Sequence, residues 1–559
     1  MTSTRISDLP LVAPPRAAPH RARLLAEIRS ASPELVRELA ARTADWYDEN
    51  GQPVLALPHV LAAGDPERVA DFLCHRGMAM VLEGHGGQMF TQLERSCPGL
   101  AEDPFVWVLR AVDAVTHEDP EAACAFLDLV DSRAGVTDSM APPEWLTVLT
   151  RAARVDAAPD RDDLGDLHGT GQPDIDCYLA AQAATATLLR GDRERAEAQL
   201  RRGLALAAGA DRPRAAVRAV TRLAVTAGYG GAVTTMRERA RKALVVAEDH
   251  ELRGSTDALH ARALAAFGAY LQGDSYSPRD LEPLARTREH RDGSVRPVGG
   301  WAAQVIGRLL AFRAGEDRYA GAEALRHSML SLLEYGGPFP VSAGDLLAHV
   351  VWALLEVREP RTARLLIGRA RTQLGDTPQV ETARVMLAVS TETVGATPVV
   401  GELLTRADDL GPVERITAWL LHSAVHADQR QRNPHRVRNG LERALELAAD
   451  SGVIRPFLDV PGTIALLDER VGGFGHRDEL VARIRNHPQA RRRPPEQQLT
   501  ATELTVLHYL PSGRTAQQIA AELGVSINTV KTHLRAIYAK FGVGSRTAAL
   551  AQARRAGLL

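Results

Sequence analysis

The sequence predicts an all-α protein, in which a long helical-repeat body is followed by a small C-terminal module of four helices. Three observations lead to this fold class. Aromatic residues make up only 4% of the 559 residues, while Ala, Leu, Arg and Glu dominate, and such residues lose little entropy in a helix. Apolar residues recur with helical spacing from about residue 21 to residue 455. No segment in that range alternates convincingly as a strand does.

Short acidic or proline-containing turns precede many of the Ala-rich segments. Such turns lie at 64–67, 118–121, 191–194 and 358–360, and Pro or Asp suits the first turn of a helix. The helices that follow carry a single apolar stripe, so they must stack on neighbours to bury it. The irregular spacing predicts degenerate tetratricopeptide-like hairpins. The alternative is an irregular helical domain without superhelical order.

The chain divides into five expected segments. Residues 1–20 are rich in Pro and Ala and should be irregular, and residues 485–498 read as a linker because Pro488, Pro494 and Pro495 discourage a helix. The remaining segments are a helical segment at 21–100, a helical-repeat sensor or interaction domain at 101–484, and the C-terminal module at 499–559.

The charge of the chain is unevenly distributed. The formal net charge is -2, yet the chain from Arg485 onward holds eleven Lys or Arg and three Glu. A basic module attached to an acidic body indicates a polyanionic partner for the module alone.

The four cysteines, Cys74, Cys97, Cys124 and Cys177, show no metal-ligand spacing. We expect buried thiols in a reducing cytoplasm. The N-terminus has no apolar signal core, and an apolar stretch at 346–355 is too short to span a bilayer. The sequence therefore predicts a cytoplasmic protein that binds no metal and no membrane.

Four helices are expected in the module, each opened by a capping residue. The caps are Thr500, Thr515, Ser526 and Ser545. The first two have Glu503 and Gln518 three residues later, which is the spacing of a capping box. Gly524 supplies the turn between the second and third helices, since glycine tolerates a positive φ.

The third helix of the module has two distinct faces. Its expected buried stripe is Val530, Leu534, Ile537 and Phe541. The opposite face carries Lys531 and Arg535 one turn apart, so both can donate to guanine O6 and N7 in a major groove. Asn528, Thr529 and the helix N-terminal amides suit phosphate oxygens. The residues expected to contact DNA are Thr515, Ser526, Asn528, Thr529, Lys531, Thr532, Arg535, Lys540 and Arg546. The alternative is a short helical bundle with a solvated charged face.

The module also carries a set of short motifs along its whole length. They are Leu499-Thr500 with Glu503, Ile519-Ala520, Leu523, Val525-Ser526, Thr529-Val530-Lys531 with His533, Gly542-Val543, and Ser545-Arg546 with Ala548. Together these resemble the LuxR/NarL-type helix-turn-helix. The resemblance implies that Lys531, Thr532 and Arg535 face bases and that the fourth helix mediates dimerisation. Thr502 and Ala536 depart from the usual Arg and Asn of that family, and neither lies on the base-facing set.

The body resembles the helical parts of MalT-like regulators. The segments 36–73 and 443–467 are similar to the regions that follow the winged helix and end the repeats in those proteins. Such proteins begin with a nucleotide-binding ATPase domain, which needs a Gly-Lys pair to hold phosphates. The three lysines here follow Arg241, Val530 and Ala539, so no P-loop exists. The chain therefore resembles a MalT-like regulator that begins after the ATPase and winged helix, with no nucleotide cofactor.

The leading interpretation is a bacterial DNA-binding transcription regulator. Its partners would be double-stranded DNA, a second copy through the C-terminal module, and an unidentified small-molecule or protein effector on the repeats. The alternative is a helical-repeat interaction scaffold whose DNA-binding module is not essential. An enzyme is not expected, because no nucleophile–base pair, metal cluster or phosphate loop occurs at recognisable spacing. The signal, the operator, the direction of regulation and the need for a separate ATPase partner stay open.

Overall fold

The computed structural model describes most of the chain outside the N-terminal segment. The described residues are 32–117, 119–134, 144–157, 169–277, 281–289, 295–298, 300–315, 317–335, 340–391, 396–427, 433–470, 473–491, 499–541, 543–555 and 558–559. Contacts divide the chain into two compact units, residues 1–154 and 155–559. The boundary expected at residue 100 lies inside the first unit, whose helices continue past it. The expectation for residues 1–20 lies outside the described residues.

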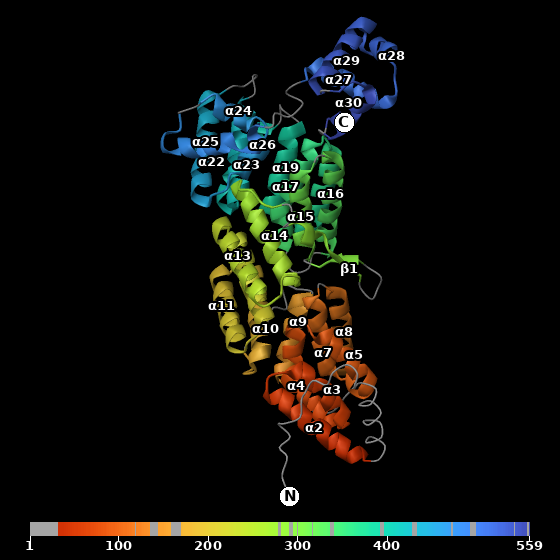
Figure 1. The fold of residues 1–559 in the computed structure, drawn as a ribbon. Helices are drawn as coiled ribbons and strands as arrows, with labels where there is room; N and C mark the ends of the chain where they lie inside the picture. Colours follow the sequence, from red (N-terminus) through yellow and green to blue (C-terminus); the bar gives the residue numbers. More distant parts are fainter. Residues whose placement is uncertain are drawn as a thin grey trace. The chain divides into compact units, whose positions relative to one another are not determined.

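The first unit is a set of helices joined by short turns (Figure 1, red to orange). They are α2 (Pro33–Glu49), α3 (Pro53–Ala63), α4 (Pro66–Leu82), α5 (Gly86–Ser96), α6 (Pro98–Ala101), α7 (Pro104–Thr116), α8 (Pro120–Ala134) and α9 (Glu144–Ala157), the last of which crosses into the second unit. The turn at 64–67 works as predicted, because the Asp65 carboxylate accepts a 3.0 Å hydrogen bond from the amide of Glu67. Consecutive helices such as α2 and α3 pack on each other.

The second unit begins with regularly spaced helices, coloured yellow in Figure 1. They are α10 (Pro173–Leu189), α11 (Arg193–Gly209), α12 (Pro213–Tyr229), α13 (Val233–Asp249) and α14 (Thr256–Gln272). Each packs on the next in chain order. The predicted stripe of α11 is confirmed, with Ala196, Leu200 and Ala207 buried and Leu204 partly buried. This arrangement agrees with a helical-repeat body.

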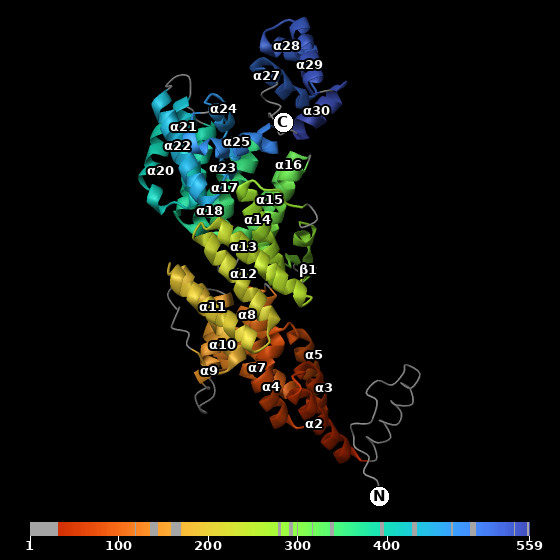
Figure 2. The ribbon, with the colours of Figure 1, turned by 60° about the vertical axis from the view of Figure 1, so that its left-hand side comes forward.

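The body continues through further helices, several of which lie side by side in Figure 2. They are α15 (Gly300–Ala314), α16 (Arg318–Tyr335), α17 (Pro340–Glu356), α18 (Pro360–Leu374), α19 (Pro378–Thr391), α20 (Ala396–Thr405), α21 (Pro412–Ala427), α22 (Pro434–Ser451), α23 (Arg455–Asp459), α24 (Thr463–Asp468), α25 (Asp478–Asn486) and α26 (Pro488–Arg491), with 3-10 turns η4 (Glu282–Ala285), η5 (Ala407–Asp409) and η6 (Gly475–Arg477). A single apolar core runs from α12 to α25.

Among the described residues, one small hairpin departs from the otherwise helical architecture. The strands β1 (Thr287–Glu289) and β2 (Val295–Pro297) pair antiparallel, with Thr287 opposite Pro297. They lie between α14 and α15 in the chain. Each strand has only three residues, which is too short for an alternating pattern to show in the sequence.

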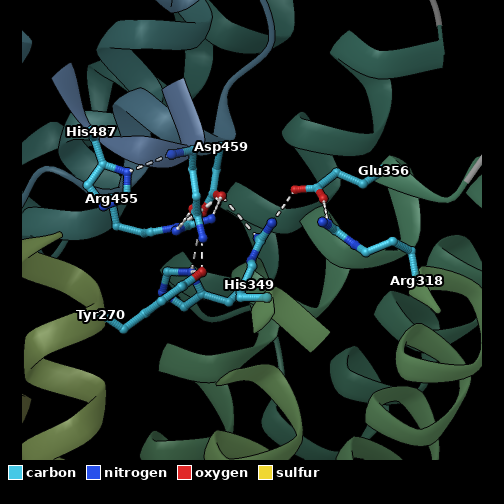
Figure 3. A network of polar contacts seen from close by, with 9 residues as sticks. Tyr270, Arg318, His349, Glu356, Arg455, Asp459 and His487 are labelled. Carbon is cyan, nitrogen blue, oxygen red and sulfur yellow. Dashed lines mark hydrogen bonds and ion pairs between the residues drawn. The ribbon is translucent and has the colours of Figure 1, made fainter. Parts of the chain in front are cut away.

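The end of the body is built around a buried carboxylate, Asp459, whose side chain is 1% exposed. Arg455, one turn earlier in α23, donates to it from Nε at 2.9 Å. Arg313 of α15 lies 3.0 Å away, and the hydroxyl of Tyr270 in α14 donates to it at 3.4 Å (Figure 3). Burial by itself raises the pKa of Asp459, but the charges of Arg313 and Arg455 outweigh it and hold that pKa below the usual range. The carboxylate therefore stays ionised in the core.

The Asp459 network extends in two further directions. Glu356, at the end of α17, pairs with both Arg313 and Arg318. Arg455 also donates to the side chain of Gln489 in α26. Buried charges persist only when they are paired, so these contacts fasten α14, α15, α17 and α23 to the last helix before the C-terminal module.

The expected linker at 485–498 is partly helical, which corrects the sequence interpretation. Residues 485 and 486 close α25, and Pro488 opens α26. Proline was expected to oppose a helix here. At the first helical position, however, its fixed φ fits and its missing N–H has no intrahelical acceptor to lose. Residues 492–498 lie outside the described residues.

The apolar stretch at 346–355 is part of α17 and is mostly buried in the core. Across the described residues, no helix combines the length and apolar character needed to cross a bilayer. The cysteines form no disulfide; Cys177 is buried, whereas Cys74, Cys97 and Cys124 are only partly buried. Burial raises the pKa of Cys74 and Cys124. The described residues also hold no group of three or more metal-ligating side chains.

Candidate nucleic-acid interface

The C-terminal module folds around its own apolar cluster. Its helices are α27 (Ala501–Tyr509), α28 (Ala516–Leu523), α29 (Ile527–Phe541) and α30 (Arg546–Arg555), with the 3-10 turn η8 (Leu510–Ser512) after α27. All four expected helices are present, and α29 and α30 begin directly after the predicted caps, Ser526 and Ser545.

Both predicted capping boxes are confirmed. The Thr500 amide donates to the Glu503 carboxylate at 2.6 Å, and the Glu503 amide donates back to the Thr500 hydroxyl at 3.3 Å. Thr515 and Gln518 make the same reciprocal pair at 2.9 and 3.3 Å. These bonds satisfy amides that have no intrahelical acceptor, so they fix where α27 and α28 begin.

The entry into α29 is fixed by a glycine and a serine. Gly524 has φ +66°, which reverses the chain after α28 at no steric cost. The Ser526 hydroxyl then accepts from the Thr529 amide at 3.1 Å. The inner stripe follows the prediction, with Val530 and Ile537 fully buried and Leu534 and Phe541 packed against the cluster.

The outer face of α29 is exposed to solvent along four predicted DNA-contacting residues, Asn528, Lys531, Thr532 and Arg535. The Thr532 hydroxyl donates to the Asn528 carbonyl at 2.9 Å. Within the described part of the chain, neither Lys531 nor Arg535 makes a hydrogen bond or ion pair. They are about 6 Å apart along the helix axis, so two unpartnered cations project from one face of the helix.

This geometry coincides with a match to a known family. Residues 497–553 match the family model GerE, described as bacterial regulatory proteins, luxR family. The C-terminal domain is a luxR-type helix-turn-helix. The match supports a DNA-binding transcription regulator.

Two of the residues predicted to contact DNA, Lys540 and Arg546, also make contacts within the luxR-type domain. Lys540 donates from Nζ to the Glu503 carboxylate at 2.6 Å and so ties α29 to α27. Burial alone raises the pKa of Glu503, but the bond from Lys540 and the amide of Thr500 lower it overall. Arg546 donates to the carbonyls of Leu510 and Arg514, at 2.7 and 2.5 Å. Both contacts favour a structural role for these cations.

The domain also has features that the sequence analysis missed. Val525 and Ile527, on either side of Ser526 at the start of α29, are apolar yet 42% and 39% exposed. Arg514, in the turn before α28, pairs with Glu522 at 2.9 Å. The sequence did not signal the exposure of Ile527, because its spacing of three and seven residues from Val530 and Leu534 continues the inner stripe.

Proposed function

We propose that this protein regulates transcription by inserting α29 of its luxR-type domain into the major groove of double-stranded DNA. Lys531, Thr532 and Arg535 face base edges, where the two cations donate to guanine. The observation that carries the proposal is the unpartnered Lys531–Arg535 pair. These cations are exposed on a helix whose other face is buried in the core of the domain.

Phosphate contacts hold the recognition helix in register. The exposed side chains of Thr515, Ser526, Asn528 and Thr529 lie at the starts of α28 and α29. Helix N-termini attract anions because their first amides are free and the helix dipole is positive there. Such contacts position the protein without reading sequence.

The domain binds as a pair at half-sites about 34 Å apart, one turn of DNA. The LuxR/NarL resemblance supports this arrangement, since the fourth helix, α30 here, mediates dimerisation in that family. Self-association through α30 doubles the number of base contacts, which raises specificity without a larger domain.

The helical repeats receive the signal, either a small molecule or a partner protein. Stacked helical hairpins present extended surfaces suited to such partners. The resemblance to MalT-like regulators supports the same assignment. The Asp459 network supports a route to the DNA-binding domain, because Gln489 of α26 bonds to Arg455 just before that domain begins.

Replacing both Lys531 and Arg535 by Ala tests this function. Each guanine contact contributes about 1–3 kcal/mol of discrimination, so the double variant should lose specific binding by on the order of 10²-fold or more. The matched control removes the same two charges from the body, at Arg241 and Lys242, which are exposed on α13. Footprints that stay unchanged in the recognition-helix variant would exclude the proposed readout. Binding should also weaken steeply with added salt, since phosphate contacts release counterions.

A further inference from the structure

The helix α2, the first one in the described residues, carries an exposed apolar stripe. Leu35, Leu39 and Trp46 of α2 are 51%, 47% and 49% exposed. Their spacing of four and seven residues places them on one side of the helix over about 16 Å. Arg42, also exposed, lies between Leu39 and Trp46 on that side. We name Leu35, Leu39, Arg42 and Trp46 the α2 stripe.

The α2 stripe is not the side of the helix that packs on its own unit. Ala40 and Ala44 are the buried residues of α2. Arg68 and Arg76 of α4 pair with Asp45 and Asp48, respectively. Half-exposed apolar side chains aligned on one side of a helix suit a contact with another molecule, and Trp and Arg are the residues that most often dominate such contacts.

Trp46 is held in place before any partner arrives. Its ring meets the edge of Tyr47 at 5.0 Å, and Tyr47 stacks on His59 of α3 at 5.6 Å. A fixed aromatic side chain loses little entropy on binding, which makes it an effective anchor.

The stripe is complementary to itself when two copies run antiparallel. A two-fold axis between residues 40 and 41 sets Leu35 against the partner's Trp46 and Leu39 beside the partner's Arg42. The same axis brings Glu38 near the partner's Arg42, along one edge of the contact between the two helices. Glu38 and Arg42 are exposed and form no ion pair within the described residues. A patch that matches itself in shape and charge is the requirement for an isologous dimer.

We infer that α2 pairs with α2 of a second copy of this chain, through Leu35, Leu39 and Trp46 with two symmetric Glu38–Arg42 ion pairs. Three half-exposed apolar side chains per copy bury less surface than a specific interface of standard size. The dimer is therefore weak, with a dissociation constant on the order of micromolar. This contact is independent of α30 and of DNA binding.

Sedimentation equilibrium of the full chain measures this association. Leu39→Glu should raise the dimer dissociation constant at least tenfold. Val245→Glu is the control, because Val245 is a 58% exposed apolar residue on α13. Glu38→Arg and Arg42→Glu should each weaken the dimer, and the double exchange should restore it, since both ion pairs reform with reversed sign. A chain that stays monomeric, or Leu39→Glu without effect, would overturn the inference.

A photo-crosslinking residue at position 46 identifies what covers the stripe. Crosslinks to residues 33–39 of a second chain support the antiparallel pair. Crosslinks to residues 1–31 of the same chain, or only to a different protein, overturn it. DNA footprinting of the same variants keeps the two proposals separate, because loss of α2 pairing leaves the recognition helix intact.

Discussion

Arg546→Ala should loosen the luxR-type domain rather than remove a DNA contact. The guanidinium donates to the carbonyls of Leu510 and Arg514, which lie at either end of the turn between α27 and α28. Without it, α30 loses these two hydrogen bonds to the turn. The turn leads directly into Thr515, so its position sets the start of α28.

The size of the effect follows from the two hydrogen bonds. A bond from a charged donor contributes about 1.5–3 kcal/mol. Arg546 is only partly buried, so in the variant water donates to the freed carbonyls and replaces part of the lost stabilisation. The free energy of unfolding of the domain should therefore fall by about 2 kcal/mol. Such a loss raises the population of the opened domain by roughly 30-fold.

Hydrogen exchange followed by mass spectrometry resolves this change locally in the full chain. Amides of α27, α28 and α29 should exchange about 30-fold faster, while those of the body keep their rates. Arg546→Lys should recover part of the protection, because one donor still reaches a carbonyl. If exchange is unchanged and only DNA affinity falls, Arg546 is a DNA contact and the structural role is wrong.

Two further predictions concern buried charges. Asp459→Asn should destabilise the body by about 3–5 kcal/mol, because the buried Arg455 loses its carboxylate partner and Arg313 keeps only Glu356. Urea unfolding checks this, and Asp409→Asn, which breaks the exposed ion pair with Arg406, should leave the midpoint unchanged. Glu503 has a folded-state pKa below the usual value near 4.3. The ionised Glu503 therefore stabilises the folded luxR-type domain at pH values above the usual pKa, and this stabilisation is lost as the pH falls through the lower folded-state pKa. With Glu503→Gln, the free energy of unfolding of the luxR-type domain should fall less steeply as the pH is lowered. If the fall is as steep as in the unchanged protein, the Glu503–Lys540 pair is not the cause of that pH dependence.

The luxR-type domain was largely predictable from sequence because its signals are local. Thr500 with Glu503, Thr515 with Gln518 and Gly524 each act within a few residues, so spacing alone determines the helix start or the turn. The roles of Lys540 and Arg546 were not predictable. Their partners lie more than thirty residues away in the chain, and nothing in local spacing distinguishes an internal cation from one that faces DNA.

The body shows the same division between local and long-range signals. The Asp65 cap, the Asp192 cap, whose carboxylate accepts from the amide of Arg195 at the start of α11, and the α11 stripe all followed from neighbouring residues. Asp459 did not, because its partners Arg313 and Tyr270 come from helices far away in the sequence. Pro488 was misjudged for a different reason: proline opposes a helix interior but suits its first turn.

Selection of bound sequences from a random DNA pool by the full chain tests the central claim most directly. The account predicts one enriched motif with guanines at positions read by Lys531 and Arg535, arranged as two half-sites about one helical turn apart. The Lys531→Ala, Arg535→Ala double variant should not enrich it. Failure of the full chain to enrich any sequence, or enrichment of the same motif by the double variant, would contradict the account.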